Sequence, residues 1–192
     1  MASKDLPRYA ATDRDAWRGW LEANHSTAAG VWLVYFKKTS GRARLDYDDA
    51  VEEALCFGWI DSVVNPVDEL RYMQLFTPRK AKSGWSALNK RRVEKLLAKG
   101  MFHPAGLAKI EAAKRDGSWE KLDAVERLEI PPDLLKAFAR AKAAQRNFLA
   151  MSPSMRKGML ARINEAKRPE TRAARVKEVV ARAMASKPGR VA

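Results

Sequence analysis

The chain has 192 residues, of which 46% are hydrophobic, and it contains six tryptophans. This composition excludes an intrinsically disordered protein and provides one domain with a buried core, with room for an appended helical region. The single cysteine excludes an internal disulfide, no apolar run is long enough to span a membrane, and residues 1–8 lack the apolar core of a signal peptide, so we expect a cytoplasmic protein.

The formal net charge of +14 is concentrated in the second half of the chain. Residues 1–79 contain 10 Lys and Arg against 12 Asp and Glu, whereas residues 80–192 contain 27 against 11. Residues 136–192 alone contain 15 basic and 3 acidic side chains. This asymmetry indicates a positive field that attracts an acidic partner, but a solvated face of a basic protein gives the same pattern.

Helix and strand patterns alternate at the start of the chain. Thr12 is a candidate N-cap for a helix over about residues 13–24, with Asp15 in its first turn. Gly30 then leads into the β-branched and aromatic run 31–36, which is typical of a buried strand.

A second helix and a hairpin follow. Asp46 is a candidate N-cap with further acidic residues in the first turn, and Gly58 ends this helix. Residues 59–64 and 70–76 have strand patterns and are separated by turn-forming residues, so they predict an antiparallel hairpin.

The chain after Pro78 has helical patterns throughout. Ser86 is the predicted N-cap of a helix over residues 87–99 that Gly100 closes. Prolines mark the starts of later helices at Pro104, Pro131-Pro132, Pro153 and Pro169. The last of these helices carries one stripe of small and apolar residues, namely Ala173, Val176, Val180 and Ala183.

These patterns predict an α+β fold with a small antiparallel sheet of about three strands surrounded by helices and an all-helical C-terminal half. We expect an α+β core domain over residues 1–130. A basic helical region over residues 131–185 would pack on it, and residues 186–192 would form a tail.

Residues 57–90 combine polar side chains with large aromatic ones. Polar groups in such surroundings need hydrogen-bond partners, so they indicate a binding site or a structural network. The candidate ligand-binding residues are Trp59, Asp61, Ser62, Arg79, Lys80, Ser83, Trp85, Ser86 and Asn89.

The segment 77–86 brings cations and hydroxyls to the start of a predicted helix. The N–H groups of a helix start favour anions, and nearby cations add to this effect. A phosphate or carboxylate ligand is therefore one interpretation, and an exposed basic loop with Ser86 as an ordinary helix cap is the other. Asn89 falls on the apolar face of the same helix as Val93, Leu96 and Leu97, where Asp61 or Ser62 would supply its hydrogen-bond partners.

Little in the sequence indicates catalysis. Asp61 is a candidate general base, but no second carboxylate lies at a suitable spacing. Cys56 lies in an apolar stretch typical of unreactive core cysteines, and His25 and His103 lack metal-ligand spacing. We predict no metal and no cofactor, and favour a non-enzymatic protein.

The basic C-terminal helices offer an alternative function. Cations spread over residues 136–182 would contact a nucleic-acid backbone. This stretch contains Phe138 and Phe148 but no Tyr or Trp, so few side chains are available for stacking on bases.

Several long motifs resemble those of one family. They are residues 17–25, 30–34, 54–62, 76–80, 83–89 and 166–172, which include Trp-Ile-Asp-Ser at 59–62 and Ser-Gly-Trp-Ser at 83–86. Together they resemble the YdeI/OmpD-associated, bacteriocin-protection family from about residue 8 to residue 183. The resemblance implies a bacterial cytosolic protein linked to bacteriocin protection and envelope stress, and it implies no reaction, cofactor or catalytic set.

Overall fold

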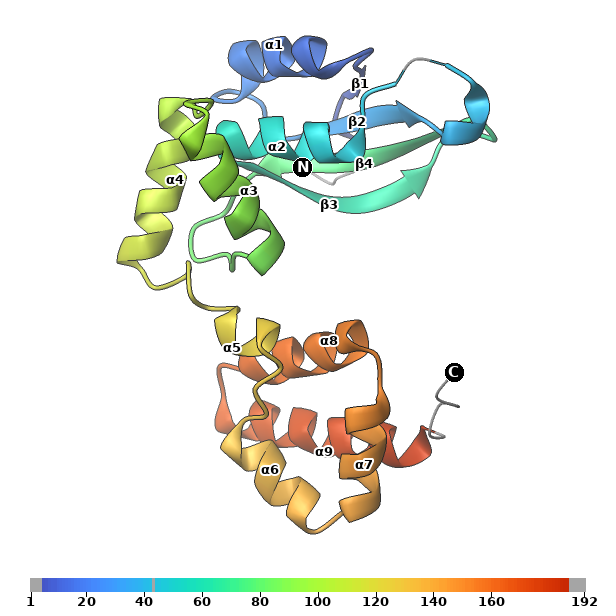
Figure 1. Ribbon diagram of the computed structural model, residues 1–192, viewed down its shortest axis with the longest axis vertical. Helices are drawn as coiled ribbons and strands as arrows, with labels where there is room; N and C mark the ends of the chain where they lie inside the picture. The colour runs from blue at the N-terminus through green and yellow to red at the C-terminus, as the bar shows by residue number, and fades with distance from the viewer. Residues whose placement is uncertain (1–4, 43, 187–192) are drawn as a thin grey trace. The chain divides into compact units, whose positions relative to one another are not determined.

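A computed structural model describes residues 5–42 and 44–186 (Figure 1). The chain divides into two compact units, Met1–Glu120 and Lys121–Ala192. The first unit combines a sheet with helices, and the regular elements described in the second unit are all helices. The predicted α+β class with a helical C-terminal half is therefore confirmed.

Within the described residues the sheet has four strands in the order β1-β2-β4-β3. Strand β2 (Val31–Phe36) is antiparallel to β4 (Arg71–Pro78), which is also antiparallel to β3 (Trp59–Pro66). The predicted hairpin and the predicted strand over residues 31–36 are confirmed. The estimate of about three strands is too low, because β1 (Arg8–Ala10) adds parallel to β2 and makes the sheet mixed. Three residues are too few to show the alternation that marks a strand.

The helices of the first unit begin close to where the sequence places them. They are α1 (Arg14–Asn24), α2 (Tyr47–Cys56), α3 (Ala87–Ala98) and α4 (Pro104–Arg115), with a short 3-10 turn η2 (Lys38–Ser40). The Ser86 hydroxyl accepts a hydrogen bond from the Asn89 N–H, as predicted for an N-cap. The N-cap of α1 is Asp13 rather than Thr12, since the Asp13 carboxylate accepts from the Ala16 N–H at 2.8 Å. Thr and Asp both favour the cap position, so the sequence pattern fits either of these neighbouring residues.

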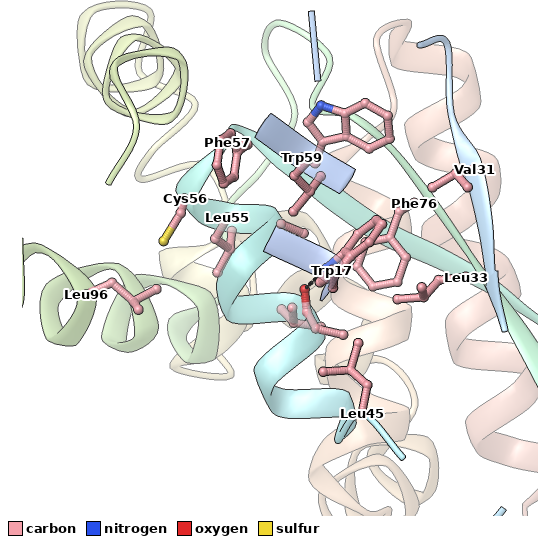
Figure 2. Packing of buried hydrophobic residues seen from close by; sticks show 14 of the residues in the cluster. Trp17, Val31, Leu33, Leu45, Leu55, Cys56, Phe57, Trp59, Phe76 and Leu96 are labelled. Carbon is pink, nitrogen blue, oxygen red and sulfur yellow. Dashed lines mark hydrogen bonds between the residues drawn. The ribbon is translucent and has the colours of Figure 1, made fainter. Parts of the chain in front are cut away.

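Aromatic side chains from α1 and the sheet form the centre of the first core. Figure 2 shows Trp17 and Phe76 close together beside α2, and their ring centroids are 5.4 Å apart. The indole Nε1 of Trp17 donates to the Ala50 carbonyl at 3.0 Å, so the one polar atom of this side chain is satisfied in the core. The helices α1 and α2 thus cover one face of the sheet (Figure 1).

Ion pairs also connect the helices of the first unit. Glu52 on α2 accepts from Lys95 Nζ on α3 at 2.8 Å and lies 3.2 Å from Arg14 Nη1 on α1. Burial raises the pKa of Glu52, but the hydrogen bond and charge of Lys95 and the pairing with Arg14 together hold it below its ordinary value. These pairs therefore link three helices while Glu52 is ionised.

We expect the ion pairs of Glu52 to make the first unit sensitive to acid. Because the folded pKa lies below the unfolded one, this stabilisation is complete above an unfolded pKa of about 4.3 and is lost as the pH falls through the folded value. The free energy of unfolding, measured by urea titration, should therefore decrease as the pH is lowered below about 4.3. In the Lys95→Met variant this decrease should be smaller. Lys99→Met, at the exposed end of α3, is the control. Equal slopes for both variants would contradict the role of the Lys95 pair.

The second unit has its own core. Its helices are α5 (Asp123–Glu126), α6 (Pro132–Ala139), α7 (Lys142–Ala150), α8 (Pro153–Asn164) and α9 (Pro169–Ala185). Phe138 and Phe148 pack at its centre, with ring centroids 5.2 Å apart.

The division between the two units falls after Glu120, ten residues before the boundary at 130 that the sequence predicts. Val125 of α5 accordingly belongs to the core of the second unit. The packing of residues 131–185 on the first unit stays a prediction, and all of the expected tail except Ser186 lies outside the described residues.

Candidate functional site

The candidate residues of the 57–90 segment fall into separate places in the first unit. Four of them, Arg79, Lys80, Ser83 and Trp85, line one cavity of about 80 Å³. The other five, Trp59, Asp61, Ser62, Ser86 and Asn89, are not among the residues that line it. The structure therefore brings together the loop after β4 but not the whole predicted set.

Arg79 is the most unusual residue of this cavity, because its side chain is only 4% exposed. Its Nη1 donates to the Gly84 carbonyl at 2.9 Å and to the Ser83 hydroxyl at 3.3 Å, and its guanidinium lies 3.7 Å from the ring centre of Trp85. Its Nε is buried and has no hydrogen-bond partner among the described residues. Arg79 forms no ion pair with any described carboxylate.

Burial lowers the pKa of Arg79 to about 10, while the charge of Asp61 acts in the opposite direction. The side chain therefore remains cationic at neutral pH. Its hydrogen-bond acceptors among the described residues are neutral and no carboxylate pairs with it, so this buried charge is incompletely compensated.

The opposite wall of the cavity comes from α4 and the turn after it. Lys109 lies on α4, and Asp116 and Ser118 follow its C-terminal end. The Asp116 carboxylate accepts from the Ser118 N–H at 2.9 Å, and hydrogen bonds from Ser118 lower its pKa. Lys80 and Lys82 of the loop add further positive charge to the lining.

Asp61 belongs to a different polar group on the sheet. Its Oδ2 accepts from Gln74 Nε2 at 2.7 Å and from the Tyr47 hydroxyl at 3.0 Å. Ser62 donates to the Leu75 carbonyl within the same hairpin. Trp59 is 1% exposed and donates to the His25 carbonyl, so it is a core residue of the first unit.

The side-chain oxygen of Asn89 has a different hydrogen-bond partner from the one that the sequence predicts. Its Oδ1 accepts from Arg92 Nη1 at 2.9 Å, one helical turn further along α3. The predicted hydrogen bond to Asp61 or Ser62 is therefore wrong, because Arg92 on the same helix satisfies the amide oxygen. Asn89 does face inward with Val93 and Leu96, but Leu97 is 43% exposed and lies outside the apolar face.

Lys109, Asp116 and Ser118 line the cavity but are not among the residues predicted from the sequence. The spacing of Lys109, Ala112, Ala113 and Asp116 places them on one face of α4 and its end, a pattern that the sequence contains. The contact between this face of α4 and the loop after β4 results from long-range packing. The sequence contains no local signal for such packing.

The cysteine and the two histidines show no arrangement for catalysis or metal binding among the described residues. Cys56 is fully buried, and burial raises the pKa of its thiol to about 12, so it is a poor nucleophile at neutral pH. The rings of His25 and His103 lie 4.6 Å apart despite their separation in sequence. In the described part of the chain no three His, Cys, Asp or Glu residues are grouped in a way that could hold a metal ion.

Several cations of the C-terminal helices have carboxylate partners. Arg172 pairs with Asp133, Lys157 with Glu126, and Arg162 with Glu178. The nucleic-acid alternative stays a prediction. None of the described helices has both the length and the apolar character needed to cross a membrane.

These features define a two-unit α+β protein with a small basic cavity in its first unit and a helical second unit. Residues 9–109 match a family model described as a domain of unknown function (DUF8412), and the chain belongs to this family because the match covers more than half of it. Residues 127–185 match the model of the Bacteriocin-protection, YdeI or OmpD-Associated family. The resemblance to that family is therefore confirmed for this part, and most of the motifs that carried it lie in the first match. No curated protein and no solved structure matches the chain.

Proposed function

We propose that the first unit binds a small anion, a phosphate or carboxylate group, in the cavity between the loop 79–85 and α4. The observation that carries this proposal is the buried guanidinium of Arg79, which has an unpartnered Nε and no ion pair among the described residues. An anion would compensate this charge, and the cavity of about 80 Å³ accommodates a group of a few heavy atoms.

The surroundings of Arg79 support an anion over a cation or a neutral ligand. Lys80, Lys82 and Lys109 line the same cavity as Arg79, and Asp116 is the one carboxylate among its described lining residues, so positive charge predominates there. The guanidinium lies 3.7 Å from the ring centre of Trp85 and is hydrogen-bonded to Gly84 and Ser83. Its orientation is therefore restrained, which favours hydrogen bonding to the oxygens of a carboxylate or phosphate group.

This binding would be the activity of a non-enzymatic, cytoplasmic protein of the bacteriocin-protection type. The name of the family that residues 127–185 match supports a protective role, and this match lies in the second unit. The anion site in the first unit would then act as a sensor or anchor for a metabolite that carries the anionic group.

We expect inorganic phosphate to raise the melting temperature of the full chain relative to chloride at the same ionic strength. At a phosphate concentration of 100 times the Kd, the stabilisation should be about 2.7 kcal/mol. Binding should also change the tryptophan fluorescence, because Trp85 lines the cavity and lies 5.0 Å from Trp119. Acetate and sulfate in parallel would identify the preferred anion geometry.

Variants distinguish anion binding from a structural role of Arg79. Arg79→Met should remove the phosphate effect without loss of stability in chloride, because it replaces an incompletely compensated charge with an apolar side chain of similar length. Lys109→Gln should weaken phosphate binding, whereas Lys99→Gln, at an exposed position outside the cavity, should not. The proposal fails if phosphate has no effect beyond ionic strength or if Arg79→Met retains the effect.

A further inference from the structure

The second unit has an open groove of about 770 Å³ between α6 and α9. Its floor is apolar and consists of small and β-branched side chains, among them Ala137, Ala173, Val176 and Val180. Three of these four residues, Ala173, Val176 and Val180, belong to the stripe that the sequence shows on the last helix. In the structure Val176 is buried, whereas Ala173 is exposed, so part of the stripe faces the groove instead of the core.

Positive charge borders the groove on both sides. Lys136 lies on α6, Arg140 is the C-cap of that helix, and Lys177 lies on α9. None of the three has a carboxylate partner among the described residues. The one carboxylate of the lining, Asp133, is paired with Arg172 at 2.6 Å. The rim therefore presents unpaired cations around an apolar floor.

The length of the groove matches a short helix. The lining residues on α9 run from Pro169 to Ala181, which corresponds to about 18 Å or roughly three helical turns. Small floor residues such as Ala137 and Ala173 leave room for the larger apolar side chains of a partner. An amphipathic helix places such side chains on one stripe, and acidic residues beside that stripe would meet the cations of the rim.

We infer that the groove between α6 and α9 is a docking site for an amphipathic helix of a partner protein that carries acidic residues on both sides of its apolar stripe. The apolar floor supplies affinity through buried area, and the unpaired Lys136, Arg140 and Lys177 select acidic flanks over basic ones. This site is independent of the anion cavity, because the residues of the two sites belong to different units.

A fluorescein-labelled peptide of about 15 residues tests this inference on the full chain, since helices of this length are marginal alone but form on binding. The peptide has Leu at helical spacing on one face and Glu on both flanks. We expect fluorescence anisotropy to give a Kd in the micromolar range that rises with salt. The same peptide with Lys in place of Glu should bind at least about tenfold more weakly, as like charges then face each other.

Two neighbouring substitutions on α9 provide a matched pair. Ala173→Asp places a carboxylate in the groove and should weaken peptide binding at least about tenfold. Ala174→Asp changes the net charge by the same amount at an exposed position outside the lining, and its effect should stay within about twofold. Circular dichroism would show that both variants keep the fold.

Three outcomes would overturn the inference. They are absence of peptide binding up to about 1 mM, equal losses for Ala173→Asp and Ala174→Asp, and a self-association of the chain that Ala173→Asp abolishes. In the last case the occupant of the groove is a second copy. The inference is also overturned if mixed-sequence RNA binds in place of the peptide and both variants weaken RNA binding equally. In that case the basic face binds a nucleic-acid backbone, and the apolar groove has no part in the binding.

Discussion

Replacing Gly106 with alanine is expected to destabilise the first unit by about 3 kcal/mol or more. A Cβ atom at this position on α4 would lie 2.1 Å from the Cys56 carbonyl oxygen and 2.7 Å from its carbon. These atoms belong to the backbone at the end of α2, so no side chain can rotate to relieve the contact. The same carbonyl accepts a hydrogen bond from the His103 N–H at 3.1 Å, which holds the start of α4 against α2. A larger residue would force the two helices apart and break this bond.

Gly19→Ala is the matched control for this substitution. Gly19 also lies in a helix of the first unit, but nothing lies within 4 Å of the position that its Cβ would occupy. There alanine should stabilise by up to about 1 kcal/mol, because it has the higher helix propensity. Urea unfolding measures both changes. A Gly106→Ala variant as stable as the unsubstituted chain would show that α2 and α4 do not pack this closely in solution.

The contact at Gly106 also shows what the sequence reveals of the fold and what it does not. The strand over residues 31–36, the β3–β4 hairpin and the cap at Ser86 have local causes, namely β-branched runs, turn residues and an N-cap side chain, and these features predict them well. Gly106 shows no local signal, because its role depends on a carbonyl fifty residues earlier in the chain. The short strand β1 is hidden for a similar reason, since only its pairing with β2 defines it.

The candidate site shows the same difference between features with local causes and features that depend on tertiary packing. Arg79, Lys80, Ser83 and Trp85 are close in sequence and meet in one cavity, so a local reading groups them correctly. Strand and helix phasing predicts that Asp61 and Asn89 join them, but phasing gives the face of an element and not its neighbour. In the structure Gln74 and Tyr47 satisfy Asp61, and Arg92 satisfies Asn89. The choice among several adequate hydrogen-bond partners depends on tertiary packing.

Glu53 on α2 is the most deeply buried carboxylate of the ion-pair group that connects α1 and α2. Its side chain is 1% exposed. Its Oε1 accepts from Arg14 Nε and its Oε2 accepts from Arg18 Nη1, both at 2.7 Å. Arg18 also forms an ion pair with Glu22 at 3.3 Å, and Glu22 is 57% exposed. The same arginine thus has one buried and one exposed carboxylate partner on neighbouring elements.

We expect Glu53→Gln to lower the free energy of unfolding by about 3 kcal/mol, since two charge-assisted hydrogen bonds are lost in a buried site. Glutamine has nearly the same shape, but its amide group donates, so it would face one of the two arginines donor against donor. Glu22→Gln removes an exposed partner of the same arginine and should cost no more than about 0.5 kcal/mol. Urea titration of both variants gives the comparison. If the two substitutions cost the same, burial does not strengthen the Glu53 pairs, and the attachment of α1 to α2 must come from the apolar contacts of Trp17 and its neighbours.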